Sequence, residues 1–98
     1  KNGKQREGKR FKSLPPALPA LLYARDVYKQ IQKQELDPGE LADRQKISES
    51  ASVLSEELAG KELFELAAAC RVAGIDPESA LRRYSNTLVD SIEERHRN

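Results

Sequence analysis

Apolar residues recur at helical spacing in the first half of the chain. They follow the i, i+3, i+4, i+7 pattern of a helix with one buried face, at Ala17, Ala20, Leu21, Ala24, Val27, Tyr28 and Ile31. Prolines stand at positions 15, 16 and 19. Because proline is tolerated only before a helix or in its first turn, the pattern predicts a helix from about Ala17 to Gln34.

The segment "LDPGEL" carries the signals of a second helix start. Asp37 stands at the N-cap position, Pro38 at the first helical position, and Glu40 three residues beyond the cap. A cap acid, a first-turn proline and a following acid together typify a helix amino terminus. We therefore expect the second helix to begin near Pro38.

Two apolar stripes follow, and they change phase near Gly60. The first is Ile47, Ala51, Leu54 and Leu58, and the second is Ala59, Leu63, Leu66, Cys70 and Ala73. A kink at Gly60 accounts for the change, and so do two helices separated by the serine-rich "SESAS" at residues 48–52. Since one unbroken helix of about 36 residues is rare in a globular domain, we favour two separate helices.

Residues that end one helix and begin the next precede the last helix. Gly74 ends the preceding helix, Asp76 is the N-cap and Pro77 occupies the first turn. Leu81, Tyr84, Leu88 and Ile92 then form one face of a helix that reaches about His96. No segment alternates like a strand, so the predicted class is all-α, a small antiparallel bundle of about four helices. Because 98 residues bury little apolar surface alone, we expect dimerisation to complete the bundle.

Charge divides the chain unequally. Residues 1–12 contain six Lys or Arg against one Glu, whereas residues 13–98 contain eleven against fifteen acids. We interpret residues 1–13 as a basic, flexible arm and residues 14–98 as one helical domain. With Phe11 as its only aromatic residue, the arm is more typical of a solvated segment than of one that binds nucleic acid.

Hydropathy and cysteine usage indicate the cellular setting. No apolar stretch approaches the roughly 20 residues that cross a bilayer, so we expect no membrane partner and a cytoplasmic protein. Cys70 is the only cysteine and lies in the apolar run "LAAACRVAG". We interpret it as a small buried thiol.

Two stretches, in order along the chain, resemble the MazG-like nucleoside triphosphate pyrophosphohydrolases. Residues 60–83, "GKELFELAAACRVAGIDPESALRR", look like the carboxy-terminal half of that family, and residues 17–24, "ALPALLYA", look like the opening of its first helix. The resemblance implies an all-α fold, usually dimeric or higher. It also implies magnesium bound by acidic residues of two helices and cleavage of a nucleotide between its α- and β-phosphates. Carboxylates three or four residues apart share one side of a helix, so two such motifs can hold the ion and the phosphates between them.

The acidic motifs of the family are not retained. When Gly60, Leu63 and Phe64 are aligned with the family's glycine, leucine and phenylalanine, Leu58 replaces a glutamate and Lys61 replaces an aspartate. The candidate remnant of the site is Glu56, Glu57, Lys61, Glu62 and Glu65. Magnesium is expected only if acids have been relocated. The pairs Glu62 with Glu65 and Glu49 with Glu56 have a suitable spacing on a helix.

The last helix offers only weak candidates for binding substrate or phosphate and for nucleophilic catalysis. The family has an asparagine and a lysine for the substrate where Ser85 and Thr87 stand, with Asn86 between them. Arg82 and Arg83 are candidates for binding phosphate, although exposed ion pairs explain them as well. His96 has no serine or cysteine partner in a motif, so no nucleophilic triad is predicted.

The sequence therefore favours a MazG-like helical domain with a degenerate or incomplete pyrophosphohydrolase site, acting as a homodimer. One alternative is a helical protein–protein interaction module without catalytic activity. Another is an active magnesium-dependent nucleotide pyrophosphohydrolase with relocated acidic ligands, for which a nucleotide would be the partner. Acids that converge from two helices would favour the enzyme, and scattered acids would favour the interaction module.

Overall fold

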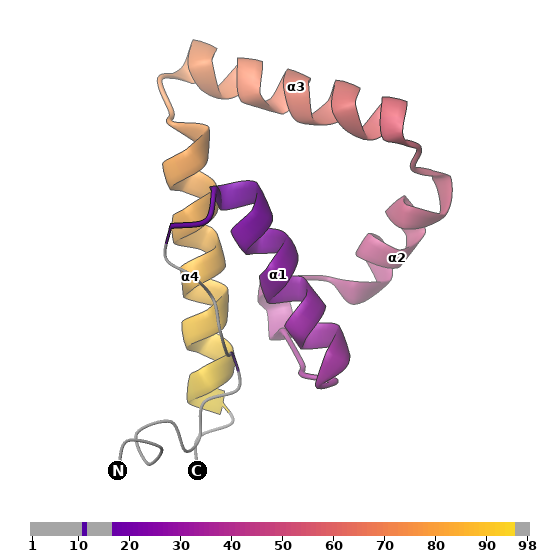
Figure 1. Cartoon of the computed structure of the whole chain (residues 1–98), viewed down its shortest axis with the longest axis vertical. Coiled ribbons are helices and arrows are strands. Elements are labelled where there is room, and N and C mark those ends of the chain that lie inside the picture. Colours follow the sequence, from indigo (N-terminus) through magenta and orange to yellow (C-terminus); the bar gives the residue numbers. More distant parts are fainter. Residues whose placement is uncertain (1–10, 12–16, 96–98) are drawn as a thin grey trace.

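The computed structural model describes Phe11 and residues 17–95, which form four α-helices and one short 3-10 helix (Figure 1). These are α1 (Ala20–Lys33), η2 (Gly39–Leu41), α2 (Arg44–Val53), α3 (Glu56–Ala73) and α4 (Pro77–Arg95). No described residue belongs to a strand, so the predicted all-α class is confirmed. Apart from Phe11, the predicted basic arm lies outside the described residues, as does His96.

The buried core lies between α1 and α4. Its apolar members come mainly from these two helices and from the chain just after α1, and they are Phe11, Ala20, Tyr23, Val27, Ile31, Leu36, Leu88 and Ile92. On α1 the buried positions recur every three or four residues, as the amphipathic pattern predicts. Within this small bundle of four helices, the buried core is therefore formed mainly by the α1–α4 pair.

The two core helices run in the same direction. The Ala20 backbone N–H donates to Glu78 Oε1 over 3.0 Å at one end, and Arg95 Nη2 donates to the Asp37 carbonyl over 3.0 Å at the other. We expected antiparallel neighbours joined by short loops. The closest pair is parallel because α2 and α3 carry the chain back to the end where α1 began (Figure 1).

The second helix does not begin near Pro38. Asp37 Oδ1 does accept the Gly39 N–H over 2.9 Å, but only the single 3-10 turn η2 follows. Gly39 has a φ of +70°, a left-handed conformation that ends helical propagation. The α-helix starts instead at Arg44, where Asp43 Oδ1 accepts the N–H groups of Gln45 and Lys46.

Separate α2 and α3 helices are confirmed, although the break falls at Leu54 and Ser55. Both residues are extended, and Ser55 Oγ accepts the Leu58 N–H over 3.1 Å as the N-cap of α3. The serines of "SESAS" all lie within α2 and are exposed. Gly60 lies within α3. A capping serine, not glycine, therefore divides the two helices.

The predicted helix end at Gly74 and the predicted cap at Asp76 are confirmed. Gly74 has a φ of +78° and its N–H reaches the Arg71 carbonyl, which ends α3 in the left-handed cap that glycine favours. Asp76 Oδ1 then accepts the Glu78 N–H over 3.0 Å, and Oδ2 accepts the Ser79 hydroxyl. Local hydrogen bonding therefore fixes this turn.

The α2–α3 segment, residues 44–73, projects from the core pair. The helix α3 lies across the end of the molecule where α4 begins. The helix α2 lies on the side of α1 that faces away from α4 (Figure 1). Neither α2 nor α3 contains a buried residue. Among the described residues, substantial helix contacts join only α1 with α4 and α3 with α4.

Candidate functional site

All five residues of the predicted remnant site lie on α3 and are exposed. Lys61 Nζ donates to Glu65 Oε2 over 2.8 Å, one helical turn away, and these two side chains are 66% and 61% exposed. An ion pair this open to solvent contributes little to stability. Lys61 therefore pairs with one of the candidate acidic ligands, Glu65.

Four of the candidate positions on α3 share one side of the helix. At about 100° per residue, Leu58, Lys61, Glu62 and Glu65 fall within one sector of the helix. Leu58 is partly buried and the other three are exposed. Acids introduced at Leu58 and Lys61 would therefore lie beside Glu62 and Glu65.

Glu49 lies on the other helix of the segment, where it accepts a hydrogen bond from Gln45 Nε2 over 3.3 Å. The break at Leu54 and Ser55 separates Glu49 from Glu56, so the two acids no longer share one helix as their spacing predicted. Within the described part of the chain, no group of three or more His, Cys, Asp or Glu side chains is arranged to hold a metal ion.

Arg82 has a structural partner rather than an open approach to phosphate. Its Nη2 donates to the Leu18 carbonyl, and its guanidinium carbon lies 5.7 Å from the centre of the Tyr23 ring. Arg82 is half-buried and fastens the turn before α1 to α4. Arg83, by contrast, is exposed. No local motif could reveal the Arg82 contacts, because they join residues about sixty positions apart.

Tyr23 extends the same network. Its hydroxyl donates to Asn86 Oδ1 over 2.5 Å. Burial raises the pKa of Tyr23, the Asp90 carboxylate raises it further, and the nearby Arg82 guanidinium opposes both. Asn86 thus holds the first helix. Of the two residues on either side of Asn86, Ser85 is buried and Thr87 is exposed.

An apolar groove opens where α1, α3 and α4 meet. Its volume is about 520 Å³, and its lining includes Leu21, Leu63, Leu66, Cys70 and Leu81. Cys70 is partly exposed in this groove, not fully buried as predicted. Leu63, Leu66 and Cys70 belong to one predicted apolar stripe, and here that stripe lines a surface groove.

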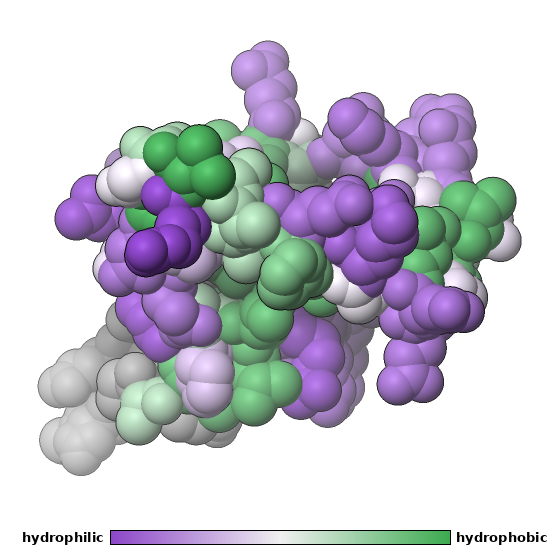
Figure 2. Space-filling view, turned by 90° about the horizontal axis from the view of Figure 1, so that it is seen from above, coloured by the Kyte–Doolittle hydropathy of each residue, from purple (hydrophilic) through white to green (hydrophobic). Residues whose placement is uncertain are grey.

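Large apolar side chains on α3 are open to solvent. Leu63 is 48% exposed, Leu66 63% and Phe64 73%. Seen from the end that α3 crosses, apolar side chains lie between charged ones across the surface (Figure 2). Exposed apolar surface of this kind marks interaction sites in proteins that fold as monomers.

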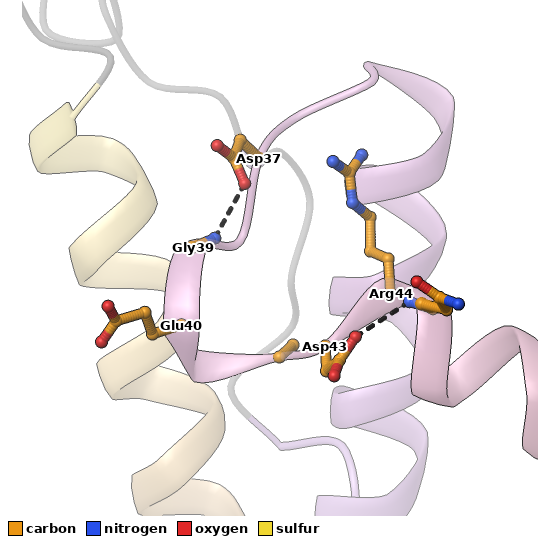
Figure 3. Close-up of a pocket in the computed structure, with 7 residues that line it drawn as sticks. Asp37, Gly39, Glu40, Asp43 and Arg44 are labelled. Atoms are coloured by element: carbon orange, nitrogen blue, oxygen red, sulfur yellow. Dashed lines mark hydrogen bonds between the residues drawn. The ribbon is translucent and has the colours of Figure 1, made fainter.

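The loop around η2 forms a polar depression of about 510 Å³ (Figure 3). Asp37 and Asp43 each accept a backbone N–H two residues further along, and Glu40 points to the other side of the loop. The two aspartates are therefore used by the turns that form the loop.

Comparison with protein-family models, with curated proteins and with solved structures gives no match to this chain. Among the described residues, none of the helices combines the length and the apolar character that spanning a bilayer requires.

Proposed function

We propose that this chain is a MazG-like helical domain whose nucleotide pyrophosphohydrolase site is degenerate, and that it acts through protein–protein association as a homodimer. The observation that carries the proposal is the exposed apolar surface of α3. An 18-residue helix that buries no residue retains apolar side chains which a partner would remove from water.

The energetics of α3 support association. Nucleating an isolated helix in water is unfavourable, and most helical stability in proteins comes from packing of an apolar face. Within one chain, α3 gains such packing only against α4 and the edge of the groove. A second copy would supply the missing contacts without any further element.

The chemistry on α3 supports a degenerate site. An ammonium group in place of a ligand carboxylate removes an oxygen ligand and adds positive charge near the ion, and Lys61 also engages Glu65. Leu58 adds an apolar side chain on the same sector. A cytoplasmic location belongs to the same proposal, because a single cysteine cannot form an internal disulfide.

Two measurements on the wild-type chain test this function. We expect sedimentation equilibrium to give a dimer at micromolar concentration, and pyrophosphate release from nucleoside triphosphates to stay at background with magnesium present. A monomer throughout the concentration range would overturn the association. Robust magnesium-dependent release would favour relocated ligands, and Glu62→Gln with Glu65→Gln would then abolish it.

Restoring the family acids tests the degenerate site directly. Leu58→Glu combined with Lys61→Asp should strengthen magnesium binding by at least about tenfold, because two carboxylates join Glu62 and Glu65 on one sector of α3. Calorimetric titration measures the change. Glu49→Gln, on α2, is the control and should leave magnesium binding unaltered. Unchanged affinity in the double variant would contradict the alignment.

A further inference from the structure

One row of residues along α3 is symmetric about Phe64. Glu57 lies seven positions before Phe64 and Arg71 lies seven positions after it. Because seven residues make almost two full helical turns, all three side chains project from the same side. The three residues are exposed, and Phe64 is 73% exposed.

Three of the four helical neighbours of Phe64 on this side are small, and the fourth is Lys61, which pairs with Glu65. Gly60 lies one turn before Phe64 and Ala68 one turn after it, and Ala67 borders them. A side chain added at Gly60 would meet nothing within 4 Å. The row therefore combines a protruding ring with shallow positions on either side that can receive another ring.

The charges at the ends of the row are opposite. Glu57 lies in the first turn of α3, where a carboxylate also complements the helix dipole, and Arg71 lies in the last turn. Neither charge has an ion-pair partner among the described residues, where the ion pairs are Arg25 with Asp26 and Lys61 with Glu65. A second α3 laid alongside in the opposite direction would bring each acid beside a base.

We propose that two copies of this chain pair through α3 in an antiparallel arrangement, with Phe64 at the two-fold axis and Glu57 of each copy beside Arg71 of the other. This inference rests on the proposed homodimer and specifies its surface. A two-fold axis makes the interface self-complementary. The same operation sets Gly60 of each copy opposite Ala68 of the other, which leaves room for the two rings.

The contributions of the parts differ. A central aromatic residue that becomes buried twice dominates the affinity, as aromatic anchors commonly do. The two solvent-exposed ion pairs add less energy but select the antiparallel direction, because a parallel pairing would place like charges together. The row thus specifies both the partner and its orientation.

The first arm of the test removes the anchor. Phe64→Asp should raise the dissociation constant of the dimer at least about 100-fold, because a central aromatic contact is lost on both sides of the axis. Ala69→Asp is the matched control, since it places the same charge on α3 about 140° around the helix from Phe64. It should leave the dissociation constant within about threefold of wild type. Sedimentation velocity over a concentration series measures both variants.

The second arm reverses the charges. Glu57→Arg alone and Arg71→Glu alone should each weaken the dimer about tenfold, since each reversal creates two like-charged contacts. The double variant Glu57→Arg with Arg71→Glu should return to within about threefold of wild type. Effects on the helix dipole predict the reverse, because both reversals are unfavourable for α3 and would add in the double variant.

The outcomes separate the two proposals. A wild-type chain that sediments as a monomer overturns the homodimer and this pairing together. A dimer that tolerates Phe64→Asp, or a double charge reversal weaker than either single reversal, overturns the pairing alone. Loss of the dimer in Phe64→Asp together with rescue by the double reversal supports both.

Discussion

The α1–α4 pair and the α2–α3 segment both carry apolar residues at helical spacing, yet only the first buries them. On α1, Val27 and Ile31 are each 1% exposed, whereas on α3 Leu66 is 63% exposed. The patterns specify which side of each helix is apolar. They do not specify whether the partner that covers it belongs to the same chain.

The contrast extends to polar contacts. Side chains of α1 and α4 reach across more than fifty positions of sequence, as Tyr23 does to Asn86 and Arg95 to Asp37. On α3, the described hydrogen bonds of the side chains are local, such as Lys61 to Glu65. The core pair is therefore held by tertiary contacts, and the segment is held by its own helices and caps.

Truncation of a core residue should produce the largest effect. Ile92 is fully buried, so Ile92→Ala should lower the free energy of unfolding by about 2–5 kcal/mol through lost burial and a cavity. In the monomeric Phe64→Asp background, Leu66→Ala on α3 should cost less than about 1 kcal/mol. Urea denaturation at one fixed protein concentration measures both. Equal costs would contradict the contrast between the two regions.

Gly39, next to the core pair, and Gly60, within α3, should respond in opposite ways to substitution by alanine. Gly39→Ala should destabilise the chain by about 1–2 kcal/mol, because φ is +70° and the new Cβ would lie 2.5 Å from Arg95 Nη2. Gly60→Ala, within α3, should instead stabilise the monomeric background by up to about 1 kcal/mol, since alanine favours helix. Thermal denaturation followed by circular dichroism distinguishes the signs. Destabilisation by both substitutions would show that α3 is not open at Gly60.

Alkaline pH should act on the core pair through Tyr23. Its pKa is raised in the folded chain, mainly by burial, so folding favours the neutral phenol. That contribution is complete below the ordinary tyrosine pKa of about 10 and is lost as the pH rises through the higher folded value. Stability should fall more steeply above about pH 10 in wild type than in Tyr23→Phe. Parallel pH profiles would contradict this assignment.

Local signals gave the parts of the fold that depend on neighbouring residues. Gly74, Asp76 and Pro77 fixed the turn before α4 because their conformations and caps need no distant partner. The start of α2 was missed because Asp37 and Asp43 are both capable caps, and the positive φ of Gly39 decides between them. The parallel direction of α1 and α4 depends on the path of α2 and α3, which return the chain to the end where α1 began. Local signals do not determine that path.

For the candidate site, the sequence likewise predicted positions within one helix but not contacts between helices. Sequence placed Glu62 and Glu65 on one side of a helix, and the structure agrees. It suggested phosphate binding or exposed ion pairs for Arg82 and did not predict its contact with Leu18, which only tertiary packing creates. It also placed Leu63 and Leu66 in one apolar stripe, but a periodic pattern identifies an apolar face without identifying what covers it.

Hydrogen–deuterium exchange across a protein concentration series tests most directly whether a second copy covers α3. The amides of α3 should gain protection as the dimer forms, with little change in α1 and α4, whose core is complete within one chain. Phe64→Asp should show the low α3 protection at every concentration. Protection of α3 in wild type that is already equal to that of α4, and independent of concentration, would contradict the account.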